Sequence, residues 1–390
     1  MSVGHRTDFY LSRESLSRPA VASRAPQAHR AVDFVRLRNE FRQLLTKTET
    51  LARLAAADRP GFRMLSELAK VSIVKARIAD QRLAHAAESN DAVWPIVGQV
   101  EQLIEEVSEL QDRLQRQLAL VAQLQLDADE LQSELQLLVS KRLVGHQPVP
   151  FHGVKLLARR LISELLYDVT PPVLHPRLAL EVLTDRLGNF GHARIFAIAL
   201  ATAHSVARVA RVTWLGEEQV EQVTAAALLQ DCGKLLVQQS PRPSRPSRHS
   251  GSSSNPRHSQ IGAAVVRSYR DAPSELASLI AGHHQRMSQM DVARNSARES
   301  PAALLAAASR FERLRIRHAD NSTLFSPTEL VDQPAMIQLW RETLDGDWNP
   351  RLVRKVLAQR DGCHESIRIA ERAKKSSRRV RGSLTAETTT

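Results

Sequence analysis

The chain has 390 residues and a formal net charge of +12 at neutral pH. Apolar residues make up 43% of it and aromatic residues only 4%, a composition typical of helical proteins, and its two cysteines exclude a disulfide-rich scaffold. We therefore expect an all-α protein with two domains, or with one domain and an extended helical region.

The positive charge predicts attraction to anions such as nucleotides, nucleic acid or acidic lipid heads. The excess is mostly arginine spread along helices and tails, and no nucleic-acid-binding motif accompanies it, so we expect no nucleic-acid partner. The longest apolar stretch, Ile195 to Thr202, is too short for a membrane span. The N-terminus lacks the apolar segment of a signal peptide. We expect a cytoplasmic protein.

The first 145 residues divide into a tail and a helical region. Residues 1–30 are rich in Ser and Arg and predict a disordered tail. Residues 31–145 are helical in pattern, with apolar residues in steps of three and four from Phe34 to Leu51. Asp58 to Gly61 interrupts this face, because proline and glycine oppose helix continuation, and a similar face resumes from Met64 to about Ala87.

The clearest periodic signal runs from Val100 to Leu138. Two heptad positions three residues apart are apolar throughout, apart from Gln117. They are Val100, Val107, Leu114, Val121, Ala128 and Leu135, and Leu103, Leu110, Gln117, Leu124, Leu131 and Leu138. This repeat predicts a coiled coil and a parallel homodimer. Ile104, Leu118 and Val139 widen the stripe, which fits an antiparallel hairpin within the chain, and both arrangements can hold.

A second helical domain is expected over residues 150–363, after the break at His146 to Pro150. Its expected helices are Lys155–Leu166, Leu178–Leu187, Ala193–Trp214, Ile261–Arg270, Ser274–His284 and Asn349–Gln359. Two polar stretches, Gln239 to Asn255 and Gln289 to Ser300, predict loops. Residues 364–390 are basic and predict a disordered tail.

One segment of this domain carries a chemical signature. From Ala225 to Leu229 an apolar helix end leads to Asp231, a turn closed by Gly233, and then Lys234. A buried helix end that presents a carboxylate beside a lysine suits metal and phosphate chemistry. The segment resembles the "LLHDIGK" signature of HD-domain metal phosphohydrolases, with Gln230 in place of the histidine.

Four further segments resemble motifs of the HD-GYP subfamily, in the family's order. They are His258–Gly262 ("H-x-x-I-G"), Ile280–Gln285 ("HHE"), Ala302–Leu314 ("ARILAVADVFDAL") and Met336–Leu357 ("A…LL…G…DP.LV…"). The resemblance covers about Gly153 to Cys363. It implies an HD-domain-like helical bundle preceded by coiled-coil helices, and cyclic di-GMP phosphodiesterase chemistry.

The resemblance also implies a ligand set. Asp231 matches the aspartate that bridges two metal ions, and His258, His283 and His284 match the ligands of one of them. Adjacent histidines point about 100° apart on an ideal helix, so both can ligate only near an end or a kink. His204 matches the first histidine of the family, with His192 as the alternative. Asp231 and Lys234 match catalytic positions, the lysine as a point charge for phosphate.

The second metal position is degenerate in this sequence. Gln230 and Ser309 replace a histidine and an aspartate, and Leu200 stands where some relatives have a glutamate. Gln285 replaces the glutamate of "HHE", and Arg286 to Met290 replaces the segment that names the subfamily. We therefore expect at most one divalent ion (Fe, Mn or Zn) per chain.

Three functions follow from these observations. The first is a signalling pseudoenzyme that binds one metal ion or a cyclic dinucleotide and dimerises through its coiled coil. The second is an active metal-dependent phosphodiesterase that hydrolyses cyclic di-GMP or a related ester. The third is a structural coiled-coil adaptor. The loss of two ligands of one metal ranks the first above the second, because a two-metal clamp needs both shells.

Overall fold

The computed structural model describes residues 36, 39–43, 45–50, 53, 63–88, 93–145, 148–167, 174–213, 215–239, 257–286, 300–319, 328–360 and 362–387. Within them the elements are the helices α2 to α14 and one pair of two-residue strands, which confirms the all-α class. The expected N-terminal tail, the break at Asp58 to Gly61 and most of the two expected loops lie outside the described residues.

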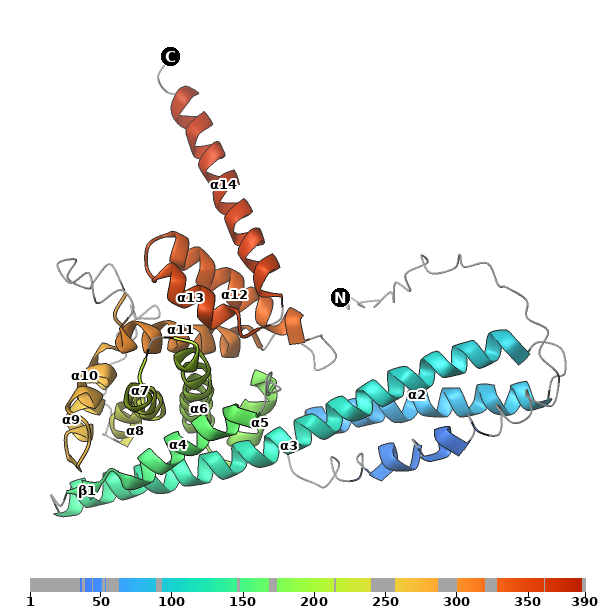
Figure 1. The fold of residues 1–390 in the computed structure, drawn as a ribbon, viewed down its shortest axis with the longest axis horizontal. Coiled ribbons are helices and arrows are strands. Elements are labelled where there is room, and N and C mark those ends of the chain that lie inside the picture. The colour runs from blue at the N-terminus through green and yellow to red at the C-terminus, as the bar shows by residue number, and fades with distance from the viewer. Residues whose placement is uncertain are drawn as a thin grey trace, which may run out of the picture.

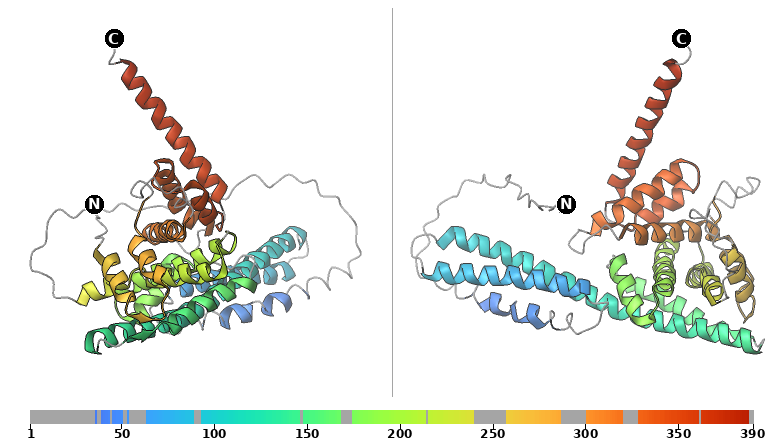
Figure 2. Two further views of the ribbon diagram at one scale, coloured as in Figure 1. Left: turned by 60° about the vertical axis from the view of Figure 1, so that its left-hand side comes forward. Right: turned by 180° about the vertical axis from the view of Figure 1, so that it is seen from behind.

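Two long helices form the extended part of the molecule. α2 (Arg63–Glu88) lies alongside the first half of α3 (Val93–Gly145), which continues into the globular part as one 53-residue helix (Figure 1). The views from behind and from the side show the same hairpin projecting from the globular part (Figure 2). Lys75 of α2 pairs with Glu106 of α3 at 2.5 Å.

Much of the heptad seam of α3 is buried within this single chain. Val107, Leu114 and Val121 are at most 1% exposed, and the last two pack with Ala69 of α2 and with α5 (Pro176–Leu187). The intrachain hairpin is therefore present. The homodimer through the same seam stays a prediction.

The globular part is a bundle of helices around α6 (Phe190–Arg211). The others are α4 (His152–Tyr167), α5, α7 (Glu217–Leu229), α8 (Cys232–Gln239), α9 (Arg257–Val266), α10 (Ser274–Gly282), α11 (Pro301–Ala319), α12 (Thr328–Leu344) and α13 (Pro350–Leu357). The sequence placed most of these within a few residues. The helix expected over Ile261–Arg270 starts earlier and ends at Val266, because Tyr269 and Arg270 form β2, which pairs in parallel with β1 (Val149–Pro150).

Local capping explains where α5 and α6 begin and end. His175 precedes α5 and its ring accepts from the Arg177 amide, while Gly188 ends α5 in the left-handed region at φ 63°. Asn189 then caps α6 through the His192 amide at 3.1 Å. By length and composition α6 is apolar enough to cross a bilayer, but 78% of that apolar window is buried inside the fold, as in a core helix.

The second half of α3 belongs to the core of the globular part. Ala128, Leu131, Leu135 and Leu138 are buried in the same cluster as the side chains of α4, α6 and α7. Side chains on both sides of the boundary expected at residues 146–150 therefore share one core. The rod and the bundle share a helix instead of being joined by a linker.

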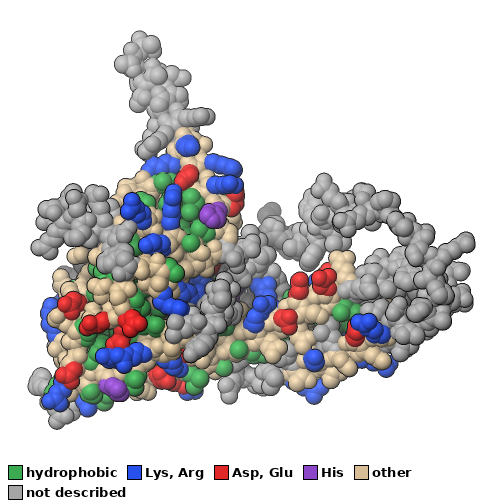
Figure 3. All heavy atoms as spheres, viewed as in Figure 1, with side chains coloured by type: hydrophobic (Ala, Val, Ile, Leu, Met, Phe, Trp, Pro, Cys, Tyr) green, Lys and Arg blue, Asp and Glu red, His purple; other side chains and the backbone are tan. Residues whose placement is uncertain are grey.

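The prediction of a disordered C-terminal tail over residues 364–390 is wrong for most of its length. Residues 363–387 form α14 (Cys363–Glu387), whose first turns pack on α12. Ser366 and Ala370 are fully buried, and Lys374 donates to the Leu344 carbonyl oxygen and pairs with Asp345 at 3.0 Å. Small residues one turn apart give this basic helix a buried face. Lys and Arg side chains gather around its base in the space-filling view (Figure 3).

Candidate metal centre

Asp231 lies in the tight turn between α7 and α8. The apolar run Ala225 to Leu229 is buried as the last turns of α7, so the chain delivers the next residues into the interior, and the Asp231 side chain is fully buried. Gly233 brings α8 against α9. A Cβ at Gly233 would overlap the His258 carbonyl oxygen and come within 2.7 Å of the Gly262 nitrogen, so only glycine permits this approach.

Three histidines reach Asp231 from two elements. His258 lies in the first turn of α9, and His283 and His284 follow the end of α10 at Gly282. Their position at a helix end lets both adjacent rings turn toward one centre, which confirms the expectation for this pair. His258 is 6% exposed and His283 1%.

The four side chains converge on one point. His258 Nε2 lies 3.3 Å and His283 Nε2 3.6 Å from Asp231 Oδ1, and His284 Nε2 lies 2.9 Å from His258 Nε2. One ligand atom from each of the four residues lies within 4.8 Å of the others. The sequence thus predicted the membership of this cluster.

Two cations complete the surroundings of Asp231. Lys234 Nζ lies 2.7 Å from Oδ1, so the lysine that the sequence assigned to phosphate is held by the aspartate. Arg313 of α11 donates from Nη2 to both carboxylate oxygens, at 3.1 and 3.0 Å. Its Nη1 lies 3.4 Å from His284 Nε2, and its Nη2 lies 3.3 Å from His283 Nε2.

Burial and charge set the protonation of the centre. Burial by itself would raise the pKa of the Asp231 carboxyl, but the Arg313 guanidinium, with Lys234, holds that pKa well below its usual range. Burial lowers the pKa of His283, and it lowers the pKa of His284 to about 2 with help from His283 and Arg313. At neutral pH the Asp231 carboxylate is therefore ionised and the imidazoles of His283 and His284 are neutral, which are the forms that bind metal.

These donors fit one divalent ion. His283 Nδ1 lies 2.6 Å from the Ile280 carbonyl oxygen and must donate to it, which leaves the Nε2 lone pair facing the centre. Donors held at about 2.0–2.3 Å by a tetrahedral ion lie roughly 3.3–3.8 Å apart, close to the separations of Asp231 from His258 and His283. The shorter contact between His258 and His284 would have to open by less than 1 Å, roughly, and to lose its shared proton.

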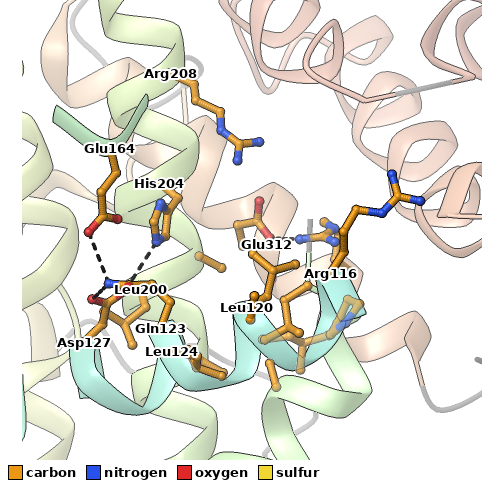
Figure 4. A pocket seen from close by; sticks show the side chains of 18 of the residues that line it. Arg116, Leu120, Gln123, Leu124, Asp127, Glu164, Leu200, His204, Arg208 and Glu312 are labelled. Atoms are coloured by element: carbon orange, nitrogen blue, oxygen red, sulfur yellow. Dashed lines mark hydrogen bonds and ion pairs between the residues drawn. The ribbon is translucent and has the colours of Figure 1, made fainter. Parts of the chain in front are cut away.

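The structure does not bring His204 to this centre. His204 faces Asp127 of α3, with Nε2 3.7 Å from Oδ2, in a different region from the four clustered ligands (Figure 4). His204 is therefore not among the four clustered ligands, and its expected role as the first ligand stays a prediction. A histidine at this point of α6 turns toward the long helix. His192, the alternative, lies in the first turn of α6 and is also not among the clustered ligands.

His204 instead lines a cavity of about 460 Å³ between α3 and the bundle. Gln123 of α3 links Asp127 at 2.9 Å to Glu164 of α4 at 3.1 Å, beside His204 (Figure 4). Leu200 lines the same cavity. Arg160 of α4 pairs with Asp127 at 2.8 Å. This polar junction ties the rod to the bundle.

Among the described residues, the side-chain polar atoms of Gln230 and Ser309 are buried and have no hydrogen-bond partner. Both amide atoms of Gln230 and the hydroxyl of Ser309 make no hydrogen bond in the part of the chain that the structure describes, and the residues are 0% and 1% exposed. Buried polar atoms normally find partners, and each one that does not costs about 1–3 kcal/mol. Ser309 lies one helical turn before Arg313 on α11.

Sequence reasoning missed Arg313. The signal was available, because Arg313 is four residues after Ser309 and therefore on the same face of α11. The sequence also gave no sign of the buried ion network beside it. There Arg315 joins Glu312 at 2.6 Å and Asp332 at 2.7 Å, and Arg360 joins Glu312 at 3.1 Å.

Comparison with known proteins gives no independent evidence for a family or a function of this chain. No protein-family model matches the chain, and neither the curated proteins nor the solved structures include a match.

Proposed function

We propose that this chain is a degenerate HD-GYP-like signalling protein that binds one divalent metal ion and has lost two-metal phosphodiester hydrolysis. The convergence of Asp231, His258, His283 and His284 on one point supports the metal site. A structural adaptor has no need of four ionisable groups buried together, because burying them costs free energy that apolar side chains would not.

The loss of hydrolysis follows from the second metal position. Gln230 and Ser309 supply an amide and a hydroxyl where the resemblance puts an imidazole and a carboxylate, and neither group is a strong ligand for a transition metal. Their polar atoms are buried and without partners in the described chain. A single bound ion would act as a Lewis acid toward a phosphoryl oxygen, but the clamp on attacking and leaving oxygens needs two ions.

Metal titration of the purified chain tests the proposal. We expect one Mn²⁺ or Zn²⁺ per chain at saturation after removal of bound ions with a chelator, and loss of that ion in His284→Ala. His364→Ala is the matched control, because His364 is an exposed histidine of α14. Two ions per chain, or none at millimolar metal in any variant, would overturn the proposal.

Turnover assays separate the pseudoenzyme from an active enzyme. We expect no hydrolysis of cyclic di-GMP by the unaltered chain with metal present. Gln230→His with Ser309→Asp should raise the stoichiometry from one ion to two, because it restores both missing ligands. Hydrolysis by the unaltered chain would show that one ion suffices and that the second of the three functions is correct.

A further inference from the structure

We infer that Arg313 is a built-in cation that occupies the metal position, so that a divalent ion and the Arg313 guanidinium exclude each other. The inference rests on the proposed metal site and adds to it a competitor supplied by the chain. Arg313 reaches the centre from α11, an element that carries none of the four ligands.

The first argument is position. Nη2 of Arg313 lies 3.0–3.3 Å from three atoms of two metal ligands, namely both Asp231 oxygens and His283 Nε2. Nη1 lies 3.4 Å from His284 Nε2. An ion bound to the same atoms at about 2.0–2.3 Å would lie in the space that the guanidinium fills.

The second argument is the direction of the lone pairs. His283 gives its Nδ1 proton to the Ile280 carbonyl, so its Nε2 carries a lone pair, and that atom lies 3.6 Å from an Asp231 oxygen. Two acceptors repel each other at this distance unless a proton donor or a cation lies between them. Arg313 Nη2 contacts both atoms and supplies that cation.

The third argument is charge. Lys234 and Arg313 already give the buried Asp231 carboxylate two positive partners. A divalent ion would add two more positive charges beside an arginine that cannot lose its proton. Mutual repulsion at this short range in a buried site favours one cation or the other.

The Arg313 side chain also has a route from the centre into solvent. Its side chain is 17% exposed, whereas that of Asp231 is 0% exposed, so the guanidinium borders solvent. Its Nε is buried without a hydrogen-bond partner in the described chain, so the arm is held only through its tip. Because the guanidinium fills the position that an ion would take, metal binding requires the Arg313 side chain to swing out.

The variant Arg313→Met tests whether Arg313 competes with the metal ion, because it removes the charged guanidinium but keeps most of the apolar part of the side chain. We expect Mn²⁺ affinity by isothermal titration calorimetry to rise about 10- to 100-fold, the equivalent of one charged hydrogen-bonding partner, at an unchanged one ion per chain. Arg313→Gln is the second variant, in case the first fails to fold. Arg310→Met is the control, because Arg310 lies on the same helix and pairs with Glu342 instead.

Thermal unfolding gives a second readout that a purely structural arginine would not produce. Without metal Arg313→Met should be less stable than the unaltered chain, because Asp231 keeps only one of its two cationic partners. Mn²⁺ should stabilise the variant more than it stabilises the unaltered chain. Equal or weaker metal affinity in both Arg313 variants, with the unaltered chain binding one ion, overturns the inference but not the proposed function. No binding by any of these proteins overturns the proposed function. Binding by the Arg313 variants alone supports the inference, because the guanidinium then excludes the ion from the unaltered chain, and it contradicts the proposed binding of one ion by that chain.

Discussion

The contact at Gly233 allows a sharp test of how the centre is held together. Gly233→Ala would place a Cβ over the His258 carbonyl oxygen, and real Cβ atoms essentially never come nearer than 3.0 Å to such an atom. α9 would have to retreat by about 1 Å, an overpacking that costs roughly 1–3 kcal/mol. Because α9 carries His258, that ligand would move away from Asp231, from which it is now separated by 3.3 Å.

Two measurements follow from this displacement. Urea denaturation should show Gly233→Ala to be destabilised by about 1–3 kcal/mol, and metal titration should show affinity lowered about 10- to 100-fold, as when the support of a ligand is lost. Gly216→Ala is the control, because nothing lies within 4 Å of a Cβ there. It should cost under about 1 kcal/mol and leave metal affinity unchanged. A Gly233→Ala protein with unaltered stability and affinity would refute the reasoning.

Two further predictions concern buried charge. Asp332→Ala should lower the free energy of unfolding in urea by about 3–5 kcal/mol, because it leaves Arg315 and Arg360 buried and short of a partner. Asp345→Ala, the control, breaks an exposed pair and should lower it by at most about 1 kcal/mol. Similar losses in the two variants would contradict the prediction. Burial, with the nearby Arg315, lowers the pKa of His175 to about 4, so below pH 6.5 the unfolded chain takes up a proton that the folded chain does not. The free energy of unfolding is therefore undiminished by His175 above pH 6.5. It falls as the pH decreases toward 4, by about 3 kcal/mol in total. His175→Asn should flatten the stability curve in that window, and an unchanged slope would contradict the assignment.

The ligand set could be predicted because its members lie in short local patterns. Asp231 and Gly233 stand together at the end of an apolar run, and the paired histidines follow the apolar end of α10. Such patterns are read from neighbours in sequence. The contact of His204 with Asp127 could not be predicted, because the direction in which a mid-helix side chain points depends on the packing of α6 against α3, and no local pattern records it.

The same limit explains the other differences. Arg313 reaches a carboxylate 82 residues earlier in the chain, so only the tertiary fold reveals its partner. The composition of α14 indicates a solvated tail, yet Ser366 and Ala370 are small enough to let one face of a basic helix approach α12. The heptad pattern predicted the burial of Val107, Leu114 and Val121, but an apolar stripe does not distinguish a partner chain from a neighbouring helix of the same chain.

Because α3 belongs to both the hairpin and the bundle, a small rotation of the helix at one end moves the other end. A continuous helix of 53 residues is about 80 Å long, and it has no proline or glycine between Gly98 and Gly145 at which to bend. A tilt of a few degrees about the junction at Asp127 would therefore displace the distant tip of the hairpin by several ångströms, on the order of 4 Å for about 5° over half that length. Conversely, a force on the tip would act on the Asp127 junction with a long moment arm. Because α3 and the bundle both line the cavity beside His204, we expect such a tilt to change the volume of that cavity.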